Sequence, residues 1–167
     1  MTTQYDAGDV RIIDTGDIRV GVLEHRGDPR GIPGSIERFI AWRKQNHLPP
    51  ASSATFNILY NNQGAGVDAF RVDLCAQTDA DVPGNAFGVV AKTIPGGRCA
   101  VLRHVGSDDD LAAIATYLYT VWLPQSGECL RDFPLYLQRV KFFPEVPASA
   151  TIFDFYLPLA PAKKMAA

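Results

Sequence analysis

The sequence is poor in cysteine and histidine and has no excess of basic residues. Among its 167 residues, the three cysteines Cys75, Cys99 and Cys129 stand far apart. This spacing gives neither a disulfide framework nor the close cysteine pairs of a zinc site, so we expect reduced, partly buried thiols and no metal. Sixteen Lys and Arg against 18 Asp and Glu give a formal net charge of −2. A nucleic-acid-binding domain usually carries a basic excess, so direct binding to nucleic acid is not expected.

Long apolar runs and targeting segments are also missing. No window approaches the roughly 18 consecutive apolar residues of a membrane-spanning helix, and residues 1–9 lack the apolar stretch of a signal peptide. No Walker or GxGxxG loop follows a predicted strand, and Pro95-Gly96-Gly97 is interpreted as a hairpin turn. With 47% hydrophobic and 20% charged residues, we expect a globular, cytoplasmic protein that uses no cofactor.

The chain contains an internal repeat. Residues 19–27 (RVGVLEHRG) match residues 98–106 (RCAVLRHVG) at five of nine positions, with an offset of 79. Two more matches follow in the same order, from residues 39–42 to 119–122 at an offset of 80 and from residues 72–74 to 153–155 at an offset of 81. Three ordered matches at nearly constant spacing indicate two copies of one module.

We interpret the chain as one domain made of two such copies. Repeat 1 covers about residues 10–80 and repeat 2 about residues 86–160, and residues 161–167 form a tail. Eight strands are expected, at residues 10–14, 18–25, 56–60, 70–76, 87–94, 98–104, 135–142 and 151–159. Turn residues at 15–17 and 95–97 predict that each copy opens with a hairpin, and a further turn is expected at 61–66.

One helix is expected in each copy. The first begins with Ser35 as its N-cap, buries Ile36, Phe39 and Ile40, and ends before Pro49. Its basic residues, Arg38, Arg43 and Lys44, are interpreted as a solvated face. The second is capped by Ser107 or Asp108 and stopped by Pro124 and Gly127; its buried positions are Leu111, Ile114, Leu118, Val121 and Trp122.

The order β-β-α-β-β in each copy predicts an α+β fold with antiparallel sheets and two main helices. Two copies of one module generate a pseudo-twofold, and ligand clefts are common where such units meet. His25 and His104 occupy equivalent positions in the two copies. Their duplication suggests a structural role rather than that of a single catalytic base.

Several segments together resemble the GyrI-like small-molecule-binding domain, also called the AraC-type effector-binding domain. They are Ile94–Arg98 leading into Val101–Gly106, then Leu118–Gly127, Phe70–Cys75 and Asp154–Leu159. The resemblance covers roughly residues 10–160. It implies duplicated βαββ (SHS2) modules around a central cleft that takes hydrophobic, often cationic, compounds. Because the two copies leave about nine residues in front, we expect a stand-alone member without the DNA-binding domain that many relatives carry.

The chain departs from the family pattern in the penultimate strand. Relatives often have Phe-Glu-x-Tyr there, and the glutamate meets cationic ligands or supports hydrolysis. This chain has Phe133-Pro134-Leu135-Tyr136. Because proline neither attracts a cation nor transfers a proton, the departure puts both properties in question. A weaker departure is the turn after Tyr60, which lacks the proline-containing pattern often seen there.

Eight residues are predicted to line the ligand site, and they are Tyr156, Tyr136, Asp154, Glu24, Tyr60, Trp122, Tyr119 and Trp42. The resemblance points to Tyr156, Asp154 and Tyr136, and strand alternation places the first two on one sheet face. Glu24 is the repeat mate of Arg103, and either Glu24 or Asp154 is the acid expected to replace the missing glutamate. Alternatives stay open, since core packing explains both Trp residues and a surface strand position explains Glu24.

Three functions follow as hypotheses. The first is non-catalytic binding of a hydrophobic or aromatic small molecule, with cationic ligands included, for sensing or sequestration. The second is a small hydrolase of reactive, cyclopropane-type electrophiles, which needs an acid or base in the cleft. The third is a protein-binding module whose partner is DNA gyrase or a separate regulator. The sequence leaves the oligomeric state open.

Overall fold

The computed structural model describes residues 5–60 and 70–162. The described chain forms two compact units. The first unit draws its described residues from Met1–Gly16, Pro95–Leu135 and Val140–Ala167, and the second unit from Asp17–Ile94 and Tyr136–Arg139. The turn predicted at residues 61–66 and most of the predicted tail lie outside the described residues.

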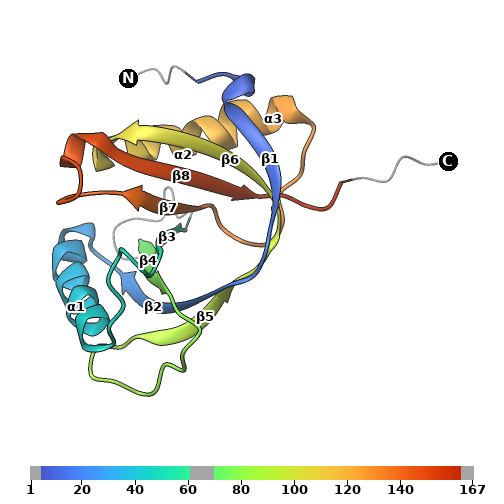
Figure 1. Cartoon of the computed structure of the whole chain (residues 1–167). Helices are drawn as coiled ribbons and strands as arrows, with labels where there is room; N and C mark the ends of the chain where they lie inside the picture. Colours follow the sequence, from blue (N-terminus) through green and yellow to red (C-terminus); the bar gives the residue numbers. More distant parts are fainter. Residues whose placement is uncertain (1–4, 61–69, 163–167) are drawn as a thin grey trace. The chain divides into compact units, whose positions relative to one another are not determined.

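All eight predicted strands are confirmed, with ends that differ by up to three residues. They are β1 (Val10–Thr15), β2 (Ile18–Arg26), β3 (Thr55–Leu59), β4 (Arg71–Gln77), β5 (Val90–Ile94), β6 (Gly97–Gly106), β7 (Tyr136–Lys141) and β8 (Thr151–Pro158). The main helices are α1 (Ile32–Gln45) and α2 (Leu111–Tyr117), which continues as a π-helical turn, η5 (Leu118–Trp122), and then as α3 (Leu123–Ser126) (Figure 1). Short 3₁₀ turns are η1 (Ala7–Asp9), η2 (Pro29–Gly31), η4 (Asp108–Asp110) and η6 (Ala148–Ala150).

Each unit contains an antiparallel sheet, so the predicted α+β fold with antiparallel sheets and two main helices is confirmed. In the first unit, β6 lies between β1 and β8. In the second unit the strand order is β7-β3-β4-β2-β5. Apolar residues of β6, β8, α2 and η5 are buried in the first unit, including Leu102, Phe155 and Leu118.

The two hairpins predicted from turn residues are wrong, and both in the same way. The strand β1 pairs with β6 and not with β2, and β5 pairs with β2 and not with β6. Thr15 lies opposite Gly97 and Ile94 lies opposite Ile18, and these two pairs are related by the repeat offset of 79. Each copy therefore gives its first strand to the second strand of the other copy, which local turn chemistry cannot reveal.

The helix α1 begins earlier than predicted and buries a different face. Asp28 accepts a hydrogen bond from the Arg30 backbone N–H, and Pro29 starts the turn that leads into the helix at Ile32. Ser35 is therefore not the N-cap but a buried helical residue. The buried face consists of Ser35, Phe39, Trp42 and Arg43, whereas Ile36 and Ile40 are 41% and 44% exposed.

Arg43 also corrects the prediction of a solvated basic face. Its guanidinium is buried and donates to the backbone oxygens of Leu48 and Ser53 and to the Thr55 hydroxyl, each at 2.8 Å. Burial lowers the pKa of Arg43 to about 10. The side chain thus fastens the end of α1 to the segment that leads into β3.

Pro124 does not stop the second helix as predicted. Since proline has no N–H, the regular hydrogen bond to the oxygen of Thr120 cannot form, and the chain widens into the π-turn η5 before continuing as α3. The wider turn shifts the helical phase, so Val121, predicted to be buried, is 41% exposed. Gly127 ends the helix, as predicted, and its backbone is in the left-handed conformation (φ 75°). Ser107 is confirmed as the cap of η4, which leads into α2.

One face of the second unit's sheet packs against α1. The core there contains Leu23, Phe39, Trp42, Leu74, Ala76 and Val89. A Cβ atom on Gly21 would lie 2.5 Å from the Trp42 ring, so the strand needs glycine at this point. The helix therefore lies directly on β2, and the opposite sheet face carries the other set of alternating side chains.

The two repeat-mate histidines hold equivalent loops. His25 contacts the Ser35 hydroxyl and the Asp28 backbone oxygen, both at 2.9 Å. His104 contacts the Asp110 carboxylate at 2.9 Å and the Tyr5 hydroxyl at 2.6 Å. In both units the imidazole links the end of a strand to the helical turn that follows it.

Candidate functional site

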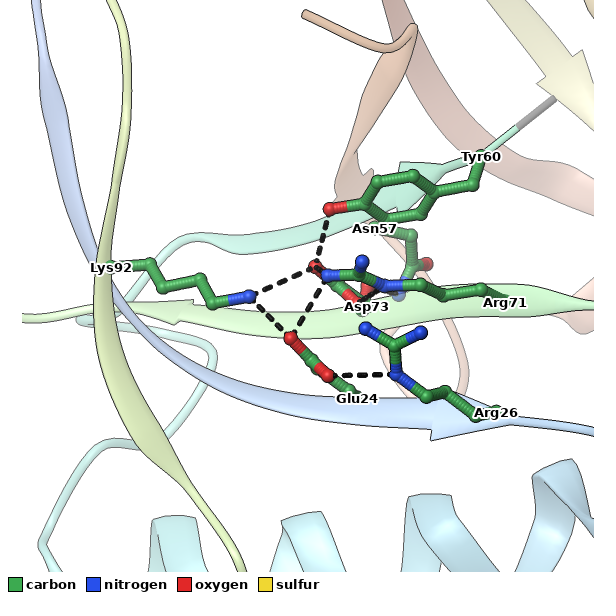
Figure 2. A network of polar contacts seen from close by, with 7 residues as sticks. All are labelled: Glu24, Arg26, Asn57, Tyr60, Arg71, Asp73 and Lys92. Carbon is green, nitrogen blue, oxygen red and sulfur yellow. Dashed lines mark hydrogen bonds and ion pairs between the residues drawn. The ribbon is translucent and has the colours of Figure 1, made fainter.

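A group of charged side chains lies on the face of the second unit's sheet that α1 does not cover. Glu24 in β2 lies directly opposite Asp73 in β4, and both alternate with the core residues Leu23 and Leu74. Figure 2 shows the two carboxylates surrounded by cationic side chains from three strands. We call this group the charged cluster; it consists of Glu24, Arg26, Tyr60, Arg71, Asp73 and Lys92.

Asp73 is the buried centre of the charged cluster. Its side chain has 0% exposure. Arg71 donates to both carboxylate oxygens, at 3.1 Å through Nε and 3.2 Å through Nη2, and the Tyr60 hydroxyl donates at 2.9 Å. The Lys92 ammonium lies 4.0 Å away. A buried carboxylate needs such partners, because an uncompensated charge in the interior is strongly unfavourable.

Glu24 lies on the more open side of the charged cluster and forms ion pairs with three cations. It accepts from Nε of Arg26 at 3.1 Å and from Nη2 of Arg71 at 2.9 Å, and it forms a short ion pair with Lys92 (Figure 2). The hydrogen bond from Lys92 is the main reason why the pKa of Glu24 lies below its ordinary value, and Arg26 and Arg71 lower it further. Glu24 is therefore ionised at neutral pH.

Tyr60 supplies the aromatic part of the charged cluster. The guanidinium carbon of Arg71 lies 3.8 Å from the centre of the Tyr60 ring, which is the geometry of a cation–π contact. Burial and then the neighbouring Asp73 carboxylate raise the pKa of the Tyr60 hydroxyl. The phenol therefore stays protonated and acts as a hydrogen-bond donor to Asp73.

Side-chain hydrogen bonds also hold the backbone of Asp73 in place. The amide nitrogen of Asn57 donates to the Asp73 backbone oxygen at 3.5 Å, and Nε of Arg139 donates to the Asn57 side-chain oxygen at 2.7 Å. These contacts connect β4 to β3 and β3 to β7. They hold the strands that position the charged cluster.

The equivalent position in the first unit carries a simpler arrangement. Arg103 in β6 lies directly opposite Asp154 in β8 and donates two hydrogen bonds to its carboxylate, at 2.8 and 2.9 Å. The Arg103 side chain is 54% exposed. Tyr156 lies two residues further along β8, and burial followed by the Asp154 charge raises its pKa.

The predicted site residues fall into three environments. Glu24 and Tyr60 are brought together in the charged cluster of the second unit. Asp154 and Tyr156 lie on one strand of the first unit. Both acids proposed to replace the missing glutamate are thus already paired with cations, Glu24 with three and Asp154 with one.

The remaining predicted residues are aromatic and largely buried. Trp42 stacks on Phe39 in the core beneath α1, and Trp122 is buried in the first unit. Tyr136 is fully buried and meets the ring of Phe56 edge-on, with ring centres 6.2 Å apart. The Tyr119 hydroxyl accepts a hydrogen bond from the Leu135 N–H at 3.3 Å, which fixes the chain next to Pro134.

Arg26, Arg71, Asp73 and Lys92 were not predicted as site residues. The internal repeat contains the signal that identifies them. Asp73 corresponds to Asp154 at the offset of 81, and the register places it opposite Glu24 as Asp154 lies opposite Arg103. The cations then follow as the residues needed beside two adjacent carboxylates.

Within residues 5–60 and 70–162, no group of three or more His, Cys, Asp or Glu side chains is arranged to hold a metal ion. In the same part of the chain, no helix combines the length and apolar character needed to span a membrane. The three cysteines are not joined in disulfides; Cys75 and Cys99 are buried and Cys129 is exposed.

Comparison with known proteins gives a consistent result. The profile of the GyrI-like small molecule binding domain matches residues 8–160. The chain is 36% identical over 154 residues to the probable transcriptional regulator YgiV of Escherichia coli (strain K12), and the match covers 91% of this chain and 96% of YgiV.

Solved structures share the fold at low sequence identity. The EcmrR C-terminal domain is similar with a TM-score of 0.73 at 12% identity, and the match covers 92% of this chain and 98% of that domain. In the EcmrR–DNA complex the TM-score is 0.71 at 13% identity; the match covers 90% of this chain, which spans only 56% of the EcmrR chain. SAV2435 bound to tetraphenylphosphonium gives a TM-score of 0.59 at 8% identity, with 91% of this chain and 94% of SAV2435 covered.

Proposed function

The chain belongs to the GyrI-like small molecule binding domain family, and on this premise we propose that it binds an aromatic or hydrophobic small molecule and leaves it chemically unchanged. Binding of a small molecule is the property that the family description names. Beyond this, we propose that the ligand is aromatic or hydrophobic and that it does not react. We also propose that it binds at the charged cluster of the second unit.

The observation that supports this position is a contrast between the two units. At the repeat-equivalent positions of Arg26, Arg71 and Lys92, the first unit carries Val105, Ile152 and Ile13. The first unit forms its sheet without these cations. Buried ion pairs often add little to stability compared with apolar residues, so we attribute the charged cluster to ligand recognition rather than to folding.

The geometry suits orientation of a bound molecule. Ligand sites are mostly apolar or aromatic with a few fixed polar groups that set the ligand's orientation. Here Tyr60 and the stem of Arg71 offer the aromatic and apolar surface, while mutual hydrogen bonds hold the charged groups in place. Groups fixed in this way lose little freedom when a ligand binds.

Binding without hydrolysis is favoured by the state of Glu24. A general base works best with a pKa near the operating pH, whereas the cations around Glu24 lower its pKa. Asp73 is fully buried and engaged by Arg71 and Tyr60. Pro134 occupies the position where relatives often carry a glutamate, and proline cannot transfer a proton.

We further propose a sensing role, which the names of the relatives support. YgiV is named a probable transcriptional regulator, and the fold recurs in EcmrR bound to DNA. We therefore propose that this chain is a ligand-binding partner that reports to a separate regulator; DNA gyrase is the alternative partner that the family resemblance implies. A pull-down with the chain, carried out with and without its ligand, tests this part of the proposal. If neither the regulator nor DNA gyrase is recovered under either condition, the sensing role is wrong.

The binding function itself is tested by a thermal-shift screen with cationic dyes, neutral aromatics and aromatic acids. A ligand at about 100 times its Kd stabilises the folded state by about 2.7 kcal/mol, which raises the Tm of a chain of this size by several degrees. Mass spectrometry of each hit after incubation distinguishes binding from hydrolysis. No stabilisation by any compound at high micromolar concentration would overturn the proposal, and turnover that disappears in Glu24→Gln would replace it with the hydrolase.

A further inference from the structure

Arg26 and Arg71 lie opposite one another on neighbouring strands. The register of β2 and β4 pairs these residues directly, one side-chain position beyond the Glu24 and Asp73 pair on the same face. Like charges directly opposite in a sheet repel. Glu24 lies beside both guanidiniums, and it accepts from Arg26 with one oxygen and from Arg71 with the other (Figure 2).

Cations outnumber carboxylates in this arrangement. Arg26, Arg71 and Lys92 contribute three positive charges against the two of Glu24 and Asp73. The most buried member is the carboxylate of Asp73, at 0% side-chain exposure, and the most exposed is Arg26, at 62%. The charge of Asp73 is therefore enclosed, and the charge most open to a molecule that approaches from solvent is the positive charge of Arg26.

Hydrogen-bond donors of these arginines stay available. Among the described residues, Arg26 donates to the cluster only through Nε, so neither of its terminal amino groups has an acceptor. Arg71 uses Nε and Nη2, and its Nη1 has no acceptor in the same part of the chain. Guanidinium amino groups match the spacing of the two oxygens in a carboxylate or related oxyanion.

We infer that the charged cluster recognises an oxyanion group, so that the ligand is an aromatic or apolar acid rather than a cation. Arg26, the free amino group of Arg71 and Lys92 bind the acidic group, and the neighbouring Tyr60 contacts the aromatic part. A cationic ligand would face three fixed cations, and both carboxylates of the charged cluster, Glu24 and Asp73, are already paired. The inference rests on the proposed small-molecule binding and specifies the charge of the ligand.

The test uses three probes with one ring system, 2-naphthoate, 2-naphthamide and 2-naphthylmethylammonium, titrated by calorimetry against the whole chain. We expect the acid to bind more tightly than the amide and the amide more tightly than the amine. Arg26→Gln should weaken naphthoate binding roughly tenfold, since hydrogen bonds to charged groups have this order of strength, and should leave amide binding unchanged. Arg30→Gln is the matched control, because Arg30 is an exposed, ion-paired arginine outside the cluster.

Arg26 is largely exposed, so its variant should fold, and circular dichroism checks this. Lys92→Gln is a second, independent variant, and it should also weaken the binding of naphthoate. Tighter binding of the amine than of the acid, or unchanged naphthoate binding in both cluster variants, would overturn the inference while the proposed binding function stands. Failure of all three probes and of every compound in the thermal-shift screen would instead remove the binding function itself.

Discussion

The second unit places Glu24 opposite Asp73, whereas the first unit places Arg103 opposite Asp154. The same position of the repeat therefore carries a negative charge in the second unit (Glu24) and a positive charge in the first (Arg103). In the first unit the result is a self-contained pair with two hydrogen bonds. In the second unit two adjacent carboxylates require cations from elsewhere, and three strands contribute to their surroundings.

The difference extends beyond this one position. The three cations of the second unit have aliphatic equivalents in the first unit, Val105, Ile152 and Ile13. A glutamate accompanied by cations and an arginine accompanied by aliphatic residues are two self-consistent solutions for the same fold. The charged cluster is therefore a coordinated feature of one unit, in which the carboxylates and the cations depend on one another.

The largest expected effect is the loss of the buried carboxylate. Asp73→Asn leaves Arg71 and Lys92 with one carboxylate instead of two and should lower the free energy of unfolding by about 3 kcal/mol. The equivalent Asp154→Asn should cost only about 1 kcal/mol, because its partner Arg103 is half exposed and can be hydrated. Urea unfolding of both variants measures the difference. Equal losses would contradict the view that the two sites differ in kind.

The next effect comes from rebuilding the carboxylate pair in the first unit. Arg103→Glu removes two hydrogen bonds and places a second acid opposite Asp154, where Val105, Ile152 and Ile13 stand at the positions of the charged cluster's cations, so we expect a loss of about 2 kcal/mol. Adding Val105→Arg should restore roughly half of this loss, since Val105 holds the position equivalent to Arg26. Urea unfolding of the single and double variants provides the comparison. If the second substitution destabilises further, the equivalence of the two positions is wrong.

A smaller effect concerns pH. Lys92, Arg26 and Arg71 lower the pKa of Glu24 in the folded state, so its contribution to stability is complete above the unfolded pKa and is lost as the pH falls through the folded pKa. Glu24→Gln should therefore reduce the free energy of unfolding by about 1 kcal/mol at pH 7. The gap between variant and wild type should shrink as the pH falls below about 4.5. A gap that stays constant down to pH 3 would show that the charge of Glu24 is not what stabilises the fold.

The smallest expected effect is that of Lys92→Ile, which gives β5 the residue type of the equivalent position in β1. Arg26 and Arg71 remain beside Glu24, so the loss should be about 0.5 kcal/mol. Chemical denaturation checks this value. A loss above 2 kcal/mol would mean that Lys92, and not the arginines, neutralises the carboxylate pair.

Much of the fold could be predicted from the sequence because the repeat gave two copies of the same element order. Strand positions followed from apolar runs, and the class followed from their number. The partners of β1 and β5 could not be predicted. The turn residues at 15–17 and 95–97 show that the chain changes direction, but they fit a hairpin and the observed exchange of strands equally well. The buried face of α1 was wrong because Asp28 and Pro29 start the helix earlier than Ser35.

The site was predictable only in part. Glu24 was found through its repeat position and Tyr60 as an aromatic residue at the end of a strand, but Asp73, Arg71 and Lys92 come from other strands. Their closeness depends on the register of β4 and β5 against β2. Tyr136 was chosen through the family resemblance and the two Trp residues for their aromatic character, which is equally typical of a core, and the structure buries all three.

Mapping of the bound ligand by NMR tests the central claim most directly. Titration of the isotope-labelled chain with the tightest-binding compound should shift the resonances of Arg26, Arg71, Lys92 and Tyr60 and leave those of the equivalent first-unit pair, Arg103 and Asp154, in place. Saturable shifts confined to Arg103 and Asp154, with the charged cluster unchanged, would contradict the assignment of ligand recognition to the second unit.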